Sequence, residues 1–245
     1  MNGKPTLLII VAALGGLVAG FLLANTINRT ELSTLRAENE RFKTERANPS
    51  SQNASSDLTE EEIKATIARA DQDPDNFATQ RNIGIAIYRY GSIKQNADFI
   101  RQSIRLLDRA ATLKPDDYDV TLSLGNANFD VGSFDKDNNA LALARTHYTK
   151  ALAAKPKDPD VLVDLALTYY LQTPPDLDSS VNEFRKALEV DPKHEKTLQF
   201  MIQALLKQNK ASEAAELLQR LRAVNPKNES IDQLTSMIAA QQPAG

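Results

Sequence analysis

Few side chains in this chain of 245 residues have the type and spacing that enzymatic or metal chemistry needs. Its two histidines, His147 and His194, do not form an H-E-x-x-H pattern, and no cysteine is present. Thiolate nucleophiles, disulfides and cysteine-based zinc sites are therefore excluded. These residue types predict no catalytic residue, no metal site and no cofactor.

Two pairs of aspartates do not fit a cation site. Asp135 with Asp137, and Asp176 with Asp178, lack the glycine and the final glutamate of a calcium-binding loop at the required positions. The stretch GGLVAG lies in an apolar segment and does not follow a strand, so it does not fit a nucleotide-binding loop. An enzyme with an unrecognised site is the alternative of a different class, and it would require titratable groups that converge in one cleft.

The charge balance does not favour nucleic acid as a partner. The formal net charge is only -3, with 29 basic and 32 acidic residues interspersed along the chain. This mixture is typical of a solvated surface.

Five prolines divide much of the chain into units of similar length. They are Pro74, Pro115, Pro156, Pro192 and Pro226, with separations of 41, 41, 36 and 34 residues. Six residues after each of the first four, a pattern with steps of three, one and three begins, which places its members on one face of a first helix. The sets are Gln80, Ile83, Gly84, Ile87; Thr121, Leu124, Gly125, Asn128; Leu162, Leu165, Ala166, Tyr169; and Leu198, Met201, Ile202, Leu205.

A second pattern, with steps of four, three and five, ends at each of the last four prolines. Small residues on both sides of a large one predict a second helix that packs closely on the first, and the proline ends that helix. The sets are Ser103, Leu107, Ala110, Pro115; Ala144, Tyr148, Ala151, Pro156; Ser180, Phe184, Ala187, Pro192; and Ala214, Leu218, Leu221, Pro226.

Together the two patterns resemble the tetratricopeptide repeat, from Pro74 to Pro226. The departures are the lack of tryptophan, Asn128 at a position that is usually aromatic, and Ile202 at a position that is usually small. The resemblance implies an all-α solenoid, because one helix pair cannot bury its apolar face alone and stacked neighbours form a continuous core. A helix that starts at the Thr59–Glu62 capping box and a C-terminal helix in NESIDQLTSMIAAQ are expected to cap the stack.

The extra residues of the longer units fall between the two helices of a pair. YGSIKQNAD and VGSFDKDNN have the glycine, serine and asparagine content of loops, and QTPPDLD contains two prolines that exclude helix. We therefore expect loops on one edge of the solenoid, either as a binding surface or as tolerated insertions.

In tetratricopeptide proteins the first helices line a groove that holds a peptide, and the resemblance implies the same here. Ile85 stands where chaperone-binding members need an asparagine to hold a terminal carboxylate, which disfavours a chaperone adaptor. The predicted peptide-binding residues are Arg81, Ile85, Tyr88, Arg89, Leu122, Asn126, Phe129, Val163, Leu167, Tyr170, Gln199, Gln203 and Leu206.

An uncharged segment precedes the repeats. After a short tail, residues 1–5, we expect residues 6–27 to form a transmembrane helix, with a cleaved signal peptide as the alternative. Small residues recur every fourth position from Ala12 to Ala24 and would allow close helix pairing.

Residues 28–47 predict a helical stalk with a short coiled-coil pattern, which would support a homodimer through the anchor and stalk. A solvated helix is the alternative. Residues 48–57 are polar and predict a flexible linker, followed by the repeat domain over residues 58–241.

The expected function is that of a membrane-anchored scaffold or adaptor that binds a protein or peptide partner. One N-terminal span followed by these repeats is also similar to bacterial cytochrome c maturation proteins, which present apocytochrome, and we keep this role as an alternative. Basic residues flank the span on both sides, so they do not decide its orientation. The lack of cysteine and the resemblance to proteins of the bacterial cell envelope favour an inner-membrane protein with its repeats outside the cytoplasm.

Overall fold

The computed structural model describes residues 59–241. The predicted anchor (6–27), stalk (28–47) and linker (48–57) lie outside this range. Between residues 59 and 241, none of the helices combines the length and the apolarity needed to cross a bilayer.

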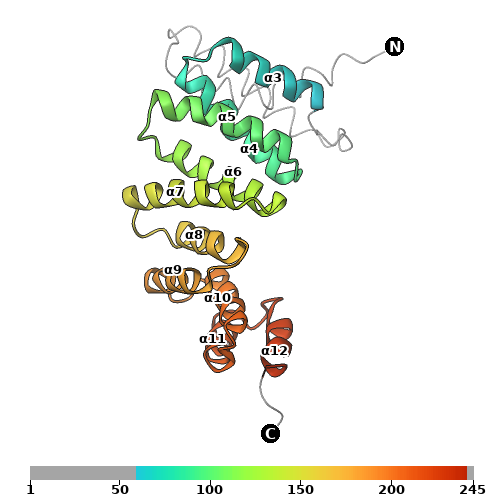
Figure 1. Cartoon of the computed structure of the whole chain (residues 1–245), viewed down its shortest axis with the longest axis vertical. Helices are drawn as coiled ribbons and strands as arrows, with labels where there is room; N and C mark the ends of the chain where they lie inside the picture. The colour runs from blue at the N-terminus through green and yellow to red at the C-terminus, as the bar shows by residue number, and fades with distance from the viewer. Residues whose placement is uncertain (1–58, 242–245) are drawn as a thin grey trace, which may run out of the picture.

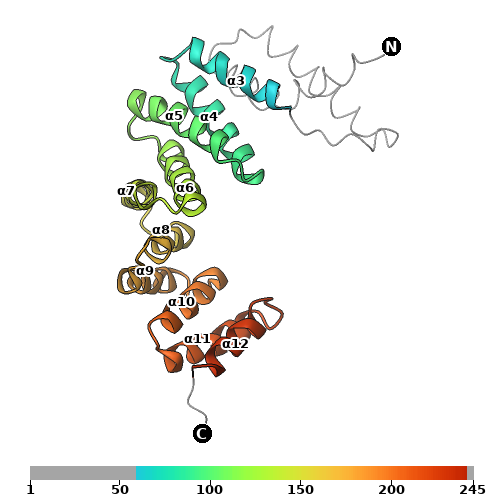
Figure 2. The same ribbon diagram turned by 45° about the vertical axis from the view of Figure 1, so that its right-hand side comes forward.

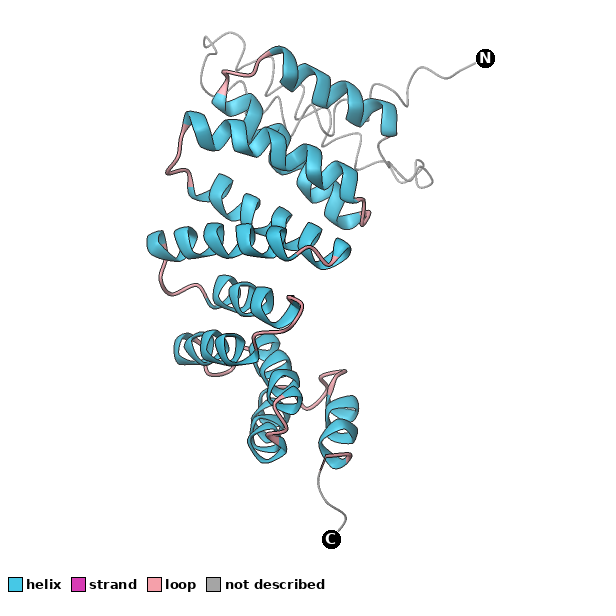
Figure 3. Ribbon diagram, viewed as in Figure 1, coloured by secondary structure: helices cyan, strands magenta, loops and turns pink. Residues whose placement is uncertain are grey.

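The described chain folds into a succession of helices joined by short turns (Figures 1 and 3). A capping helix comes first, then four pairs that we number units 1 to 4, then a second capping helix. The bounds are α3 Glu60–Gln72; α4 Phe77–Ile93 with α5 Ala97–Leu113; α6 Tyr118–Asp135 with α7 Asn138–Ala154; α8 Pro159–Leu171 with α9 Leu177–Val190; α10 Glu195–Lys207 with α11 Ala211–Val224; and α12 Ile231–Ala239.

The stack forms an arc. In Figure 2 the first helices α4, α6 and α8 lie on its inner side, and the second helices α5, α7 and α9 lie on its outer side. Each first helix contacts the first helix of the next unit, and α10 contacts α12. This arrangement confirms the expected all-helical solenoid of paired helices.

The core lies between the paired helices and continues from one unit to the next. The large residue at the centre of each second-helix pattern is buried, as shown by Leu107, Tyr148, Phe184 and Leu218. Asn128, the departure from an aromatic position, is also buried and donates from Nδ2 to the carbonyl oxygen of Leu124 at 2.8 Å. The amide is therefore satisfied within its own helix.

Side chains that accept hydrogen bonds from free backbone N–H groups start the helices from α3 to α9. Asn76, Asp117 and Asp158 cap α4, α6 and α8, two residues after a repeat proline. At the N-terminal end, the predicted Thr59–Glu62 capping box starts α3. The predicted C-terminal cap is also present as α12, whose buried side chains pack on the last pair.

The prediction that all the insertions form loops was wrong for units 1 and 2. Tyr90–Ile93 and Val131–Asp135 continue the first helices. Only residues 94–96 and 136–137 connect the two helices within each pair. The extra residues thus lengthen both helices of each pair, to 17 or 18 residues against 13 or 14 in units 3 and 4. QTPPDLD does break the helix, as its two prolines predicted, since residues 172–176 are not helical.

Glycines make the longer helices possible. A Cβ placed on Gly91 would lie 3.0 Å from the backbone nitrogen of Ile100, and one on Gly132 would lie 2.9 Å from that of Leu141. The neighbour in each case includes rigid backbone, so only glycine lets the added turns approach. The residues that suggested loops therefore serve close helix packing.

Candidate protein-binding face on the first helices

One row of residues on each first helix is largely accessible to solvent. It comprises the positions 4, 8, 11 and 15 residues after each repeat proline, and we call it the inner stripe. All of its members except the buried Leu167 are at least partly exposed. The stripe consists of Ala78, Asn82, Ile85, Arg89; Asp119, Ser123, Asn126, Asp130; Asp160, Asp164, Leu167, Leu171; and Lys196, Phe200, Gln203, Lys207.

The predicted peptide-binding residues divide into two groups by burial. Val163, Leu167, Tyr170 and Leu206 are buried and belong to the largest core cluster. Their side chains pack between helices in this structure. The other nine are accessible: Arg81, Ile85, Tyr88, Arg89, Leu122, Asn126, Phe129, Gln199 and Gln203. Peptide binding by these residues stays a prediction.

Charge is segregated along the inner stripe. Its four carboxylates all belong to units 2 and 3, whereas unit 1 contributes Arg89 and unit 4 contributes Lys196 and Lys207. An acidic centre thus lies between two basic ends. A partner with the complementary order of charges can match this arrangement.

Polar contacts between successive units hold the first helices in register. The Nε atom of Arg81 lies 3.3 Å from Oδ1 of Asp117, and the same guanidinium also pairs with Asp119. At the other end, Nε2 of Gln199 donates to Oδ1 of Asn228 at 2.7 Å. Arg81 and Gln199 are equivalent residues of units 1 and 4, so one predicted peptide-binding residue joins unit 1 to unit 2 and another joins unit 4 to the turn before α12.

Asp130, in the middle of the acidic centre, is held by two hydroxyl groups of α4. Its Oδ2 accepts from Ser92 Oγ at 2.7 Å and from Tyr88 Oη at 3.3 Å. Burial raises the pKa of this carboxyl above its ordinary value, and the two hydroxyl donors only partly offset that effect. Burial together with the nearby Asp130 charge also raises the pKa of Tyr88, so this phenol stays protonated and can donate.

Asp164 has a different environment one unit further on. Its Oδ1 lies 2.7 Å from Nζ of Lys196 in α10. Burial raises the pKa of Asp164, while the Lys196 ammonium counteracts the rise. Close by, Oη of the buried Tyr148 donates to Oδ1 of Asn126 at 3.0 Å.

The comparisons with known proteins agree on the fold. A tetratricopeptide repeat family model matches residues 176–238, from the cap of α9 to near the end of α12. Among solved structures, MamA (41-end) from Desulfovibrio magneticus RS-1 is similar, with 18% identity, a TM-score of 0.56, and 70% of this chain and 88% of that chain covered. No curated protein sequence matched.

Two further structures show the same similarity. A crystal structure of MamA has 18% identity and a TM-score of 0.55, covering 68% of this chain and 88% of that chain. A thermophilic TPR protein of Thermus thermophilus has 12% identity and a TM-score of 0.52, covering 73% of this chain and 89% of that chain. The chain has a tetratricopeptide-repeat fold. At these identities the likeness concerns the fold alone.

Sequence reasoning missed two carboxylates of this tetratricopeptide face. Asp130 lies 15 residues after its repeat proline, as Arg89 does in unit 1. Arg89 is among the predicted peptide-binding residues, but the prediction does not include the equivalent position in unit 2. Asp164 and its partner Lys196 occupy positions 8 and 4 residues after their prolines, which the groove prediction did not include. Applying each groove position to every unit would have found Asp130.

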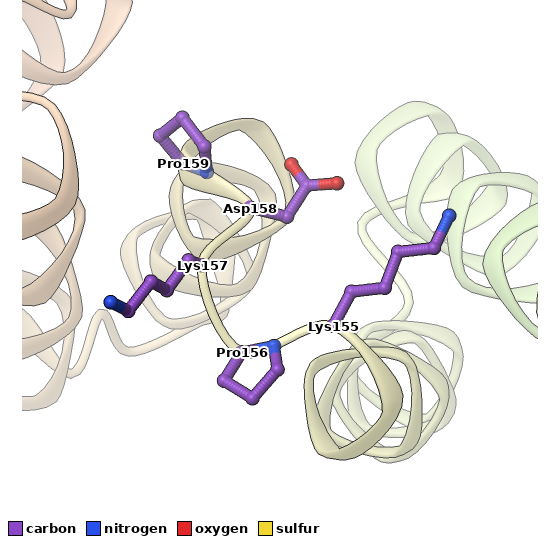
Figure 4. Close-up of a pocket in the computed structure, with 5 residues that line it drawn as sticks. All are labelled: Lys155, Pro156, Lys157, Asp158 and Pro159. Carbon is purple, nitrogen blue, oxygen red and sulfur yellow. The ribbon is translucent and has the colours of Figure 1, made fainter.

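A shallow pocket at the turn between α7 and α8 does not suit an anion. It has a volume of about 580 Å³ and is lined by Lys155, Pro156, Lys157, Asp158 and Pro159. Figure 4 shows the two lysine side chains pointing in opposite directions. Lys155 Nζ instead lies 3.5 Å from the centre of the Tyr118 ring, and Asp158 caps α8.

The tetratricopeptide solenoid provides no evident metal centre in its described part. Over residues 59–241, no group of three His, Cys, Asp or Glu side chains could hold a metal ion. His147 is half-buried, and burial lowers the pKa of its imidazole, with the Lys150 charge acting in the same direction. His194 lies 3.3 Å from Asp160 and bonds to Thr197.

Proposed function

We propose that this protein is an interaction scaffold whose inner face binds a segment of a partner protein, where the inner face comprises the inner stripe and the accessible predicted peptide-binding residues beside it. The observation that supports this most directly is the partial exposure of apolar side chains on successive first helices. Ile85, Leu122 and Phe129 are only partly covered, although each packs against a core cluster at its edge. Such side chains supply apolar contact area while polar neighbours fix orientation.

The inner face also has the rigidity that a binding platform needs. Arg81 links units 1 and 2, and Gln199 links unit 4 to the turn before α12, both through hydrogen bonds. Lys196 pairs with Asp164 across the α8–α10 boundary. A surface that is already ordered loses little conformational freedom on binding. The tetratricopeptide fold, shared with other repeat proteins, supports this assignment by analogy.

A pair of matched substitutions tests the proposal. The partner captured by the full chain is purified, and its affinity is measured for Leu122→Lys on the inner face and for Leu143→Lys on the outer helix α7. Leu143 is 52% exposed, so it serves as a control for adding a charge to an apolar surface position. Leu122→Lys should weaken binding at least about tenfold. Equal affinities for the two variants would contradict the proposal.

Membrane attachment is part of the same proposal. It rests on the uncharged segment 6–27, which is long enough for one span, and on the polar linker that follows the stalk. The solenoid would then stand close to the bilayer, outside the cytoplasm. Two reporters fused after Gly245 test this orientation. A reporter that works only outside the cytoplasm should show activity. Activity of a reporter that works only in the cytoplasm would refute the orientation.

A further inference from the structure

Three of the four carboxylates on the inner stripe have a basic side chain of this chain beside them. Asp119 pairs with Arg81, and Asp164 pairs with Lys196. Asp160 lies 3.3 Å from Nε2 of His194. Within residues 59–241, Asp130 differs, because its contacts are the neutral hydroxyls of Ser92 and Tyr88.

This difference matters because the fold has also partly removed Asp130 from water, as it has Asp164, which has Lys196 beside it. Burial is the largest influence on its pKa, and none of the influences comes from a cation. Charged groups withdrawn from water are normally paired with an opposite charge. Nothing in the described chain supplies that charge, while the two hydroxyls keep the carboxylate in a fixed orientation.

The surroundings of Asp130 suit the side chain of a basic amino acid. Asn126, one helical turn earlier, adds a second oxygen acceptor on the same row. The partly exposed Phe129 offers apolar surface for an aliphatic stem. A single carboxylate and one amide oxygen are too few ligands for calcium, which takes six to eight.

We propose that the centre of the inner stripe binds a lysine or arginine side chain of the partner, which pairs with the Asp130 carboxylate. This inference rests on the proposed binding function of the face and adds the chemistry of the ligand. The basic ends of the stripe, with Arg89 at one end and Lys207 at the other, repel such a side chain. They therefore direct the partner's basic residue to the acidic centre.

Three capped tripeptides test the proposal. Each has leucine on both sides of a central lysine, norleucine or glutamate, and each is titrated into the full chain at low salt while the backbone amide signals of α4 and α6 are followed by NMR. The lysine peptide should bind about tenfold more tightly than the norleucine peptide, which has a similar stem without the charge. The glutamate peptide should bind most weakly.

Two variants locate the preference. Asp130→Asn should reduce the affinity for the lysine peptide to that for the norleucine peptide and leave the latter unchanged. Asp160→Asn, which alters another carboxylate of the stripe, should retain the preference. Thermal unfolding of both variants checks that they are folded.

The possible results separate this inference from the proposed function. Equal binding of the lysine and norleucine peptides to α4 and α6, or a lysine preference that survives Asp130→Asn, overturns the inference and leaves the binding face in place. If none of the three peptides shifts these signals, both the inference and the proposed function are refuted.

Discussion

Gly132 packs so closely on Leu141 that a Cβ at this position would lie 2.7 Å from the Leu141 Cγ atom and 2.9 Å from its backbone nitrogen. The contact joins the added turn of α6 to the start of α7. Because part of the obstruction is backbone, side-chain rotation alone cannot relieve it. Helix separation in unit 2 therefore depends on this glycine.

We expect Gly132→Ala to destabilise the protein by about 1 to 3 kcal/mol, since the methyl group overfills a closely packed interface. The gain in helix propensity from alanine, about 1 kcal/mol, should not compensate. Urea unfolding of the full chain measures the change. The control is Ser133→Ala, at a partly exposed position of the same helix, which should be neutral or slightly stabilising. If Gly132→Ala were more stable than wild type, the close helix approach would not require glycine.

Asp130→Asn should change stability in a pH-dependent way. The folded-state pKa of this carboxyl is raised above 3.8, so its stabilising contribution is present at low pH and is lost as the pH rises through the folded pKa. The variant should therefore be slightly more stable than wild type at pH 7.5, and the difference should vanish towards pH 4. Thermal unfolding at both pH values measures it.

The other groups that face Asp130 affect this comparison little. Tyr88 and Ser92 on α4 and Tyr148 on α7 do not titrate in this range, because burial raises the pKa of both phenols. The Asp130 charge also raises the pKa of Asp164 on α8, but it is the smallest of the influences on that carboxyl. Asp71 provides a control of opposite sign. Arg105 and Arg109 lower its pKa, so Asp71→Asn should destabilise at pH 7.5. An Asp130→Asn variant less stable than wild type at every pH would contradict the prediction.

Lys196→Met should destabilise the protein by about 1 kcal/mol at pH 8, because it leaves the half-buried Asp164 carboxylate without its charged donor. The ammonium is partly exposed, which limits the loss. The loss should shrink at acidic pH, where Asp164 can take up a proton. Adding Asp164→Asn to Lys196→Met should recover part of the stability, and a double-mutant cycle without coupling would rule out a stabilising pair.

Much of the fold follows from spacing in the sequence. The step patterns correctly placed the buried Tyr148, Phe184 and Leu198, because helical periodicity determines which side chains share a face. The insertions were harder to interpret, since Gly91 and Gly132 suit a loop and a close helix contact equally well. Only the position of the facing helix distinguishes these two uses.

The candidate site was predictable only in part. Repeat alignment identified accessible residues such as Ile85 and Leu122 but also selected Val163 and Tyr170, which are buried. Their exposure depends on how neighbouring units tilt, and this is not encoded in a single unit's period. Asp130 gains its significance from Ser92 and Tyr88 on another helix, a tertiary relationship that sequence spacing did not reveal.

A photo-crosslinking scan tests the central claim most directly. A photoreactive residue is placed at Arg89, Asp160 or Lys207 on the inner stripe, and at Gln102, Thr149 or Lys186 on the outer helices, all of which are exposed. With the purified partner, crosslinks should form from the inner positions, map to one segment of the partner, and be lost in Leu122→Lys. Crosslinks that form only from the outer positions would contradict the account.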